Sequence, residues 1–339
     1  MKIIEKRNLI LGLAFVIGTA AAQVTNAGNV DVIKTLPLSG GGRWDYIVAD
    51  SAANRLFIAR ATHVSVLDLS SGAEIGDIPE TPGVHGIAIA DDLGIGFITN
   101  GGEGKVLVFD LKTLKPVTKI TVGEGPDSVV YVKSAHKVFV QNGKSKSSSV
   151  IDAEKKQVIA TIPISGKPEY TVTDNAGNLY INNADGNSIV NLDTSSNKIK
   201  ASWKLSGCEE PTGLAIDSSA HTLFSSCGNK VLAVVDATTG KVKQTLPIGE
   251  DCDAVAFDPE TKLVFASSGE GQVEVIGQQK GRYSVLKTIK TRPGSKTMGL
   301  DPAGHRIYIP IADFTGKPTT RPRPSVVPGT IKVLVIGSR

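Results

Sequence analysis

Several features that mark well-known classes of protein are missing from this 339-residue chain. Aromatic residues make up only 5% of it, and no stretch interleaves aromatic and basic side chains as a groove for single-stranded nucleic acid would. The chain has no C-x-x-C-H, H-E-x-x-H or G-x-S-x-G motif and no P-loop. The sequence therefore does not indicate the haem, zinc-protease, serine-hydrolase or nucleotide sites that these motifs mark.

Charge of one sign is not in large excess either. The formal net charge is +4 at pH 7, and Lys2, Lys6, Arg7 and Glu5 account for half of it. The rest of the chain is nearly neutral, so we expect neither nucleic acid nor an acidic membrane surface as a partner.

The only long apolar run lies at the start of the chain. A basic beginning precedes an apolar stretch at 9–22 that ends in three alanines, which is the pattern of a signal peptide. The run is too short for a convincing membrane span. We predict a signal peptide over 1–22, cleavage near Ala22, and a periplasmic or secreted, monomeric mature protein without an integral membrane segment. Such a compartment permits disulfides.

What the chain does have is many short β-type runs. Val, Ile and Thr recur between Gly, Asp, Asn and Ser, there are 36 glycines, and no helical periodicity of useful length follows residue 22. These features predict an all-β protein with tight turns.

An internal repeat defines the fold further. One aromatic residue recurs every 40 to 44 residues inside a β-type run, at Phe57, Phe97, Phe139, Tyr180, Phe224, Phe265 and Tyr308. Each of these seven units is long enough for four strands and their turns, and four-stranded units repeated radially form a β-propeller. We predict a seven-bladed β-propeller over residues 28–339.

The two chain ends complement each other. The seventh unit stops after its third strand, and the segment VDVIKTLPLSG, from Val30 onward, matches the fourth strand KVKQTLPIG of the fifth unit. We therefore expect the N-terminal strand to complete the last blade and remove an unpaired sheet edge.

The repeat resembles the YVTN-repeat (YncE-like) β-propellers. The tetrapeptide FITN at 97–100 is close to the motif that names the family, YINN and FIAR are weaker versions, and the VGEGPDSV segment and the V-x-V-x-D strands also fit. The resemblance covers the whole mature chain and implies a bacterial periplasmic or secreted protein, but such propellers carry several kinds of function.

Two sets of polar residues map to one face of the predicted ring. We define the upper face as the one that carries the loops entering each blade and the loops joining strands two and three. The residues entering each innermost strand, here called the mouth ring, are Asp45, His85, Asp127, Glu169, Thr212, Asp253 and Thr297. The residues ending each second strand, here called the second-strand set, are Arg60, Asn100, Asn142, Asn183, Cys227, Ser268 and Ile311.

These sets predict a ligand site at the channel mouth. Its expected residues are Asp45, Arg60, His85, Asn100, Asp127, Asn142, Glu169, Asn183 and Asp253. Carboxylate and amide oxygens also suit a divalent cation. The alternative is a polar rim that water alone fills.

The five histidines fall into two groups. His136, His221 and His305 occupy the same turn in three blades, which indicates a turn role. His63 and His85 map to the upper face beside Asp45 and Asp127, so these four form a candidate metal or acid–base site. A pair of solvated surface histidines is the alternative.

Two further patterns predict structural roles. Aspartates end five third strands, where they are expected to bond the next turn, at Asp68, Asp110, Asp152, Asp193 and Asp236. We predict a disulfide between Cys208 and Cys227, which lie nearly opposite each other in a hairpin. Cys227–Cys252 is the competing pair, and either pair leaves one free thiol.

The last blade contains a Pro- and Arg-rich insertion over 312–330. Its prolines favour an extended, polyproline-like segment that cannot join a sheet. We expect it to project beside the channel mouth, as a lid or docking arm or as a tolerated surface insertion.

The expected function is that of a non-catalytic scaffold that binds a small molecule or a periplasmic protein through its upper face. The alternative is a metal-dependent lactonase or hydrolase in which a divalent cation is held by Asp45, Asp127, Glu169 and Asp253. A third possibility, a haem carrier, would need His85 as an axial ligand.

Overall fold

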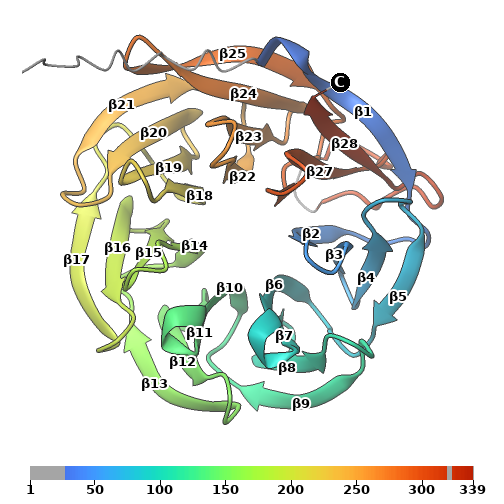
Figure 1. Ribbon diagram of the computed structural model, residues 1–339, viewed down its shortest axis with the longest axis vertical. Coiled ribbons are helices and arrows are strands. Elements are labelled where there is room, and N and C mark those ends of the chain that lie inside the picture. The colour runs from blue at the N-terminus through green and yellow to red at the C-terminus, as the bar shows by residue number, and fades with distance from the viewer. Residues whose placement is uncertain (1–26, 319–322, 339) are drawn as a thin grey trace, which may run out of the picture.

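The computed structural model describes residues 27–318 and 323–338, and the predicted signal peptide lies outside them. Seven separate four-stranded antiparallel sheets stand around a central channel (Figure 1). The helices of the described residues are three single 3-10 turns, η1 (Ala27–Asn29), η2 (Asp91–Leu93) and η3 (Lys133–Ala135). None of them is long and apolar enough to cross a membrane. The prediction of a seven-bladed, all-β propeller is confirmed.

Within each blade the strands follow one another from the channel outward. The first three blades are β2 (Trp44–Asp50), β3 (Arg55–Arg60), β4 (His63–Asp68) and β5 (Glu74–Ile78); β6 (Val84–Ala90), β7 (Ile95–Asn100), β8 (Lys105–Asp110) and β9 (Pro116–Thr121); and β10 (Pro126–Val132), β11 (Lys137–Asn142), β12 (Ser147–Asp152) and β13 (Gln157–Pro163). The fourth and fifth are β14 (Pro168–Thr173), β15 (Asn178–Asn183), β16 (Ser188–Asp193) and β17 (Lys198–Lys204); and β18 (Pro211–Asp217), β19 (Thr222–Cys227), β20 (Val231–Asp236) and β21 (Val242–Pro247). The last two are β22 (Cys252–Phe257), β23 (Val264–Ser268), β24 (Gln272–Gln279) and β25 (Arg282–Lys290); and β26 (Gly299–Asp301), β27 (Arg306–Ile311), β28 (Lys332–Ser338) and β1 (Val30–Pro37).

The N-terminal strand closes the ring as the sequence predicts. Strand β1 pairs antiparallel with β28, from Val30 opposite Ser338 to Pro37 opposite Lys332. In Figure 1 the first strand, in blue, lies along the last strand, in dark red. The outermost strand of the seventh blade thus comes from the other end of the chain, and the two ends hold each other in place.

The hydrophobic core lies between the blades. Seven buried clusters occur, and each combines residues of two adjacent blades. The repeated aromatic side chains belong to these interfaces: Phe57 of the first blade, for example, lies 5.8 Å from Phe109 of the second between ring centroids. The repeat is therefore a packing signal, because each blade buries one large side chain against its neighbour.

The turns confirm the structural roles assigned to the aspartates and to three histidines. Asp193 Oδ1 accepts hydrogen bonds from the backbone N–H groups of Ser195 and Ser196, at 3.1 and 2.8 Å. These bonds, together with those from the two serine hydroxyls, hold the pKa of Asp193 well below its usual range. The three turn histidines all have a left-handed backbone, with φ of 51° at His136, 47° at His221 and 51° at His305.

The predicted disulfide is also present. Cys208, in the loop before β18, is bonded to Cys227 at the end of β19, with Cα atoms 5.3 Å apart. Cys252 is a buried free thiol. Burial raises its pKa, so the thiol stays protonated at neutral pH and is a poor nucleophile.

Candidate functional site: the channel-mouth cavity

A cavity of about 500 Å³ lies at the channel mouth, and every blade contributes to its wall. Its lining includes all seven residues of the mouth ring, Asp45, His85, Asp127, Glu169, Thr212, Asp253 and Thr297. The structure thus brings together seven side chains from seven separate sheets.

A local irregularity of the strands explains this convergence. In the first six blades the mouth-ring residue is the second residue of the innermost strand. The pairing register of that strand with its neighbour shifts at the same place, between Trp44 and Ile47 in the first blade and at the corresponding residues in the next five. A bulge of this kind re-aims a side chain. Here it leaves the polar residue directed into the channel.

The second-strand set corrects one prediction. Arg60, Asn100, Asn142 and Asn183 were expected on the same rim, but they are buried and none of them lines the cavity. Arg60, which is 0% exposed, donates to the backbone carbonyls of Ser39 and Gly41 at 3.2 and 2.8 Å.

The three asparagines are held in similar ways. Asn100 and Asn183 each donate to a carbonyl of the loop entering their own blade, at 3.2 Å to Glu80 and 2.8 Å to Ser165. Asn142 donates to serine hydroxyls of the neighbouring strand β12. The amide nitrogens of the three asparagines therefore bond loop and strand partners, whereas their side-chain oxygens are buried without a hydrogen-bond partner among the described residues.

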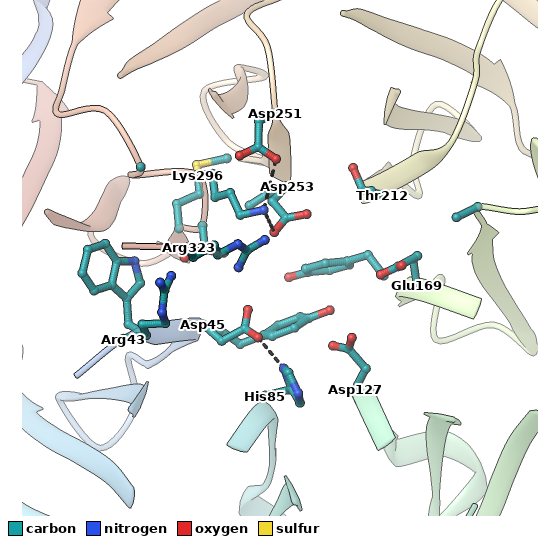
Figure 2. A pocket seen from close by; sticks show the side chains of 18 of the residues that line it. Arg43, Asp45, His85, Asp127, Glu169, Thr212, Asp251, Asp253, Lys296 and Arg323 are labelled. Atoms are coloured by element: carbon teal, nitrogen blue, oxygen red, sulfur yellow. Dashed lines mark hydrogen bonds and ion pairs between the residues drawn. The ribbon is translucent and has the colours of Figure 1, made fainter. Parts of the chain in front are cut away.

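Three mouth-ring residues from consecutive blades form a tight cluster. Asp45 Oδ2 lies 2.5 Å from His85 Nδ1, and one ligand atom each of Asp45, His85 and Asp127 lie within 4.8 Å of one another. Figure 2 shows the two carboxylates on either side of the His85 ring. His63, predicted to join them, is not part of the cluster, since its Nε2 lies 3.7 Å from Asp77 on the outer strand β5.

The side chains of this cluster shift one another's pKa values. Enclosure in the channel, and then the charge of Asp45, raise the pKa of Asp127. Burial acts to lower the pKa of His85, but its hydrogen bond to Asp45 and the charge of Asp127 outweigh burial, so this pKa is raised. The imidazole is therefore readily protonated when nothing else is bound between the carboxylates.

The opposite side of the cavity carries three basic side chains, one of which is paired with two aspartates. Lys296 Nζ lies 2.9 Å from Asp253 Oδ2 and 3.1 Å from Asp251 Oδ1. The guanidinium groups of Arg43 and Arg323 lie on the same side (Figure 2). The cavity thus has an Asp–His–Asp side and a Lys–Arg side.

Two tyrosines that the sequence analysis did not single out meet across the channel. Tyr46 follows Asp45 on β2, Tyr170 follows Glu169 on β14, and these strands face each other across the ring (Figure 1). Their rings stack with centroids 5.1 Å apart. Burial raises the pKa of both phenols, that of Tyr170 to about 12, so both hydroxyls stay protonated and can donate hydrogen bonds. The sequence signal that could have identified this pair is an aromatic residue directly after the mouth-ring residue in two blades.

The Pro- and Arg-rich insertion forms part of the cavity wall. Phe314 pairs with Val326 through an isolated β-bridge, and its ring lies 6.0 Å from that of Trp44. Phe314, Pro318 and Arg323 line the cavity. The insertion therefore lies beside the channel mouth, and residues 319–322 fall outside the described residues.

Comparisons with known proteins point to one relative. No protein-family model matches the chain. Over 195 residues it is 29% identical to the uncharacterized protein YncE of Salmonella typhimurium and 28% identical to that of Salmonella typhi. Each match covers 55% of this chain and 54% of the relative, so it spans about half the length of either protein.

Solved structures show the same fold. Hydrazine synthase of Kuenenia stuttgartiensis has a TM-score of 0.70 at 14% identity, covering 80% of this chain and 94% of that one. U3-55K and the WD40 repeats of RRP9 have TM-scores of 0.74 and 0.75 at 10% and 11% identity, covering 91% and 92% of this chain and 98% of each of theirs. At such identities these likenesses establish the propeller fold alone.

Proposed function

We propose that this chain, a seven-bladed β-propeller with sequence similarity to the YncE proteins, is an exported scaffold that binds a small polar molecule at its channel mouth. The main support is that all seven blades supply a polar mouth-ring side chain to one cavity of about 500 Å³. Small-molecule sites commonly measure roughly 300–1,000 Å³. The signal-like residues 1–22 and the Cys208–Cys227 disulfide support export into an oxidising compartment.

The lining suggests the chemistry of the ligand. Lys296 and Arg323 offer positive charge on one side, and the protonated Tyr46 and Tyr170 offer phenol donors. An anionic oxygen group, such as a carboxylate or a phosphate, satisfies both kinds of partner. We therefore propose a small anion-bearing metabolite as the ligand, and a docked periplasmic protein as the alternative occupant of the same face.

Filling the cavity should abolish this binding. Ala184 lines the cavity and is 8% exposed, so Ala184→Phe places a ring in the ligand space. Small carboxylates and sugar phosphates, screened by thermal unfolding, should include compounds that stabilise the wild type by about 2.7 kcal/mol at 100 times the Kd. The same compounds should leave Ala184→Phe unchanged.

The matched control is Ala53→Phe, in the exposed turn between β2 and β3 at the far end of the blade. This variant should respond as the wild type does. A ligand that stabilises Ala184→Phe as much as the wild type must bind elsewhere, and that outcome rejects the cavity as the binding site.

A metal-dependent hydrolase of the lactonase kind is the second candidate function. The observation in its favour is the close approach of Asp45, His85 and Asp127, since an ion held there would polarise a carbonyl or activate water. Lactone hydrolysis that needs a divalent ion would favour this candidate over a binding protein.

A further inference from the structure

Nitrogen and oxygen donors meet at one point of the channel mouth. Asp45, His85 and Asp127 come from β2, β6 and β10, the innermost strands of three consecutive blades. One ligand atom of each lies within 4.8 Å of the other two. Two atoms bound to the same zinc ion at about 2.0–2.2 Å lie no more than ~4.4 Å apart. A shared ion would therefore take the place of the proton in the Asp45–His85 hydrogen bond, whose two atoms lie 2.5 Å apart, with Asp127 close enough to reach the same ion.

Asp127 is the unsatisfied member of the acidic mouth ring. Glu169 is paired with Lys167, Asp253 with Lys296, and Asp45 with His85. Within the described part of the chain, the Asp127 carboxylate has no hydrogen-bond or ion-pair partner, and the residue is half-buried. Figure 2 shows it pointing into the cavity. A half-buried carboxylate that no protein group pairs is available to a ligand in the cavity.

The His85 ring is held in a fixed position. Its Nδ1 is bonded to Asp45 on one side, and on the other side a Cβ at Gly101 would lie only 2.9 Å from Nε2. The backbone of Gly101 therefore packs against the ring where any other residue would displace it. These two contacts fix the plane of the imidazole next to the Asp45 carboxylate.

The donor set selects a class of ion. One imidazole nitrogen with carboxylate oxygens suits first-row transition ions such as Zn²⁺ and Mn²⁺. Ca²⁺ prefers six to eight oxygen ligands. Because the protein supplies only three donors here, any further ligand positions would face the cavity, whose opposite wall carries Lys296 and Arg323.

We propose that Asp45, His85 and Asp127 bind one divalent transition ion of the Zn²⁺ or Mn²⁺ class. The ion then holds an oxygen anion whose remaining charge faces Lys296 and Arg323. The metal site stands on its own geometry, and only its role in holding the anion rests on the proposed binding function.

The test is calorimetric titration of the chelator-stripped protein with ZnCl₂ and with MnCl₂, in the absence of any organic ligand. One ion per chain should bind to the wild type, with CaCl₂ binding more weakly. Asp127→Asn keeps the size of the side chain and removes its charge. It should weaken binding by more than the ~10–100-fold that loss of a partner behind a metal ligand costs.

Asp91→Asn, at an exposed carboxylate of η2 that pairs with Lys133 away from the cavity, is the control and should keep wild-type affinity for the ion. If Asp127→Asn fails to fold, His85→Gln replaces it. Absence of stoichiometric binding, or equal affinity in the wild type and Asp127→Asn, overturns the metal site. Anion binding that Ala184→Phe abolishes in such a metal-free protein would show that the proposed function survives without the ion.

Discussion

Leu36→Ala in the closing strand β1 should lower the free energy of unfolding by roughly 2–5 kcal/mol, the usual cost of truncating a fully buried leucine. Leu36 is 1% exposed and belongs to the cluster between the seventh and first blades. Leu36 lies on the strand that pairs with β28, so the cavity created there weakens the packing where the two chain ends meet. Urea unfolding followed by circular dichroism measures the change.

Thr35→Ala is the matched control for this prediction. Thr35 is the preceding residue of the same strand and is exposed, so its truncation should change stability by no more than about 0.5 kcal/mol. Equal, small effects of the two substitutions would mean that the N-terminal strand is not part of the core of the ring.

Removing the disulfide should have the second large effect. Cys208 and Cys227 are separated by 19 residues, and closing a loop of that size stabilises by about 3 kcal/mol in the chain-entropy model. The double variant Cys208→Ala, Cys227→Ala should therefore lose about that much free energy of unfolding, measured by urea titration. A double variant is used because either single change leaves an additional free thiol.

Two comparisons check that the bridge itself is responsible. Reduction of the wild type should lower its unfolding midpoint nearly to that of the double variant. Cys252→Ala removes a buried thiol and should leave the sensitivity to reductant unchanged. A wild type whose midpoint does not move on reduction would contradict a stabilising disulfide.

The fold was predictable because a propeller repeats its pattern. The aromatic at Phe57 carries little information alone, but seven equivalents at similar spacing define the blade, and each packs at an interface between blades. The match between the segment beginning at Val30 and the fourth strand of another blade predicted the closure. The role of the turn aspartates could be predicted from local chemistry alone, because their carboxylates accept hydrogen bonds from the next few backbone N–H groups.

The site was harder to predict because alternation along a strand does not show which way a bulge turns a side chain. Six of the seven mouth-ring residues lie at such a bulge and face the channel. Arg60 and the asparagines of the second-strand set lie at regular strand ends and face loop or strand partners. Tyr46 and Tyr170 stack although their blades are far apart in the sequence, and no local sequence pattern indicates that the two rings are in contact.

The most direct test of ligand binding at the channel mouth is native mass spectrometry. It measures the mass of the folded protein, isolated without chelator from the cells that make it. We expect the wild type to carry the extra mass of an organic ligand, beyond that of any metal ion, which disappears on denaturation and is absent from Ala184→Phe. No such ligand mass in the wild type, or the same ligand mass in both proteins, would contradict a cavity that holds a ligand.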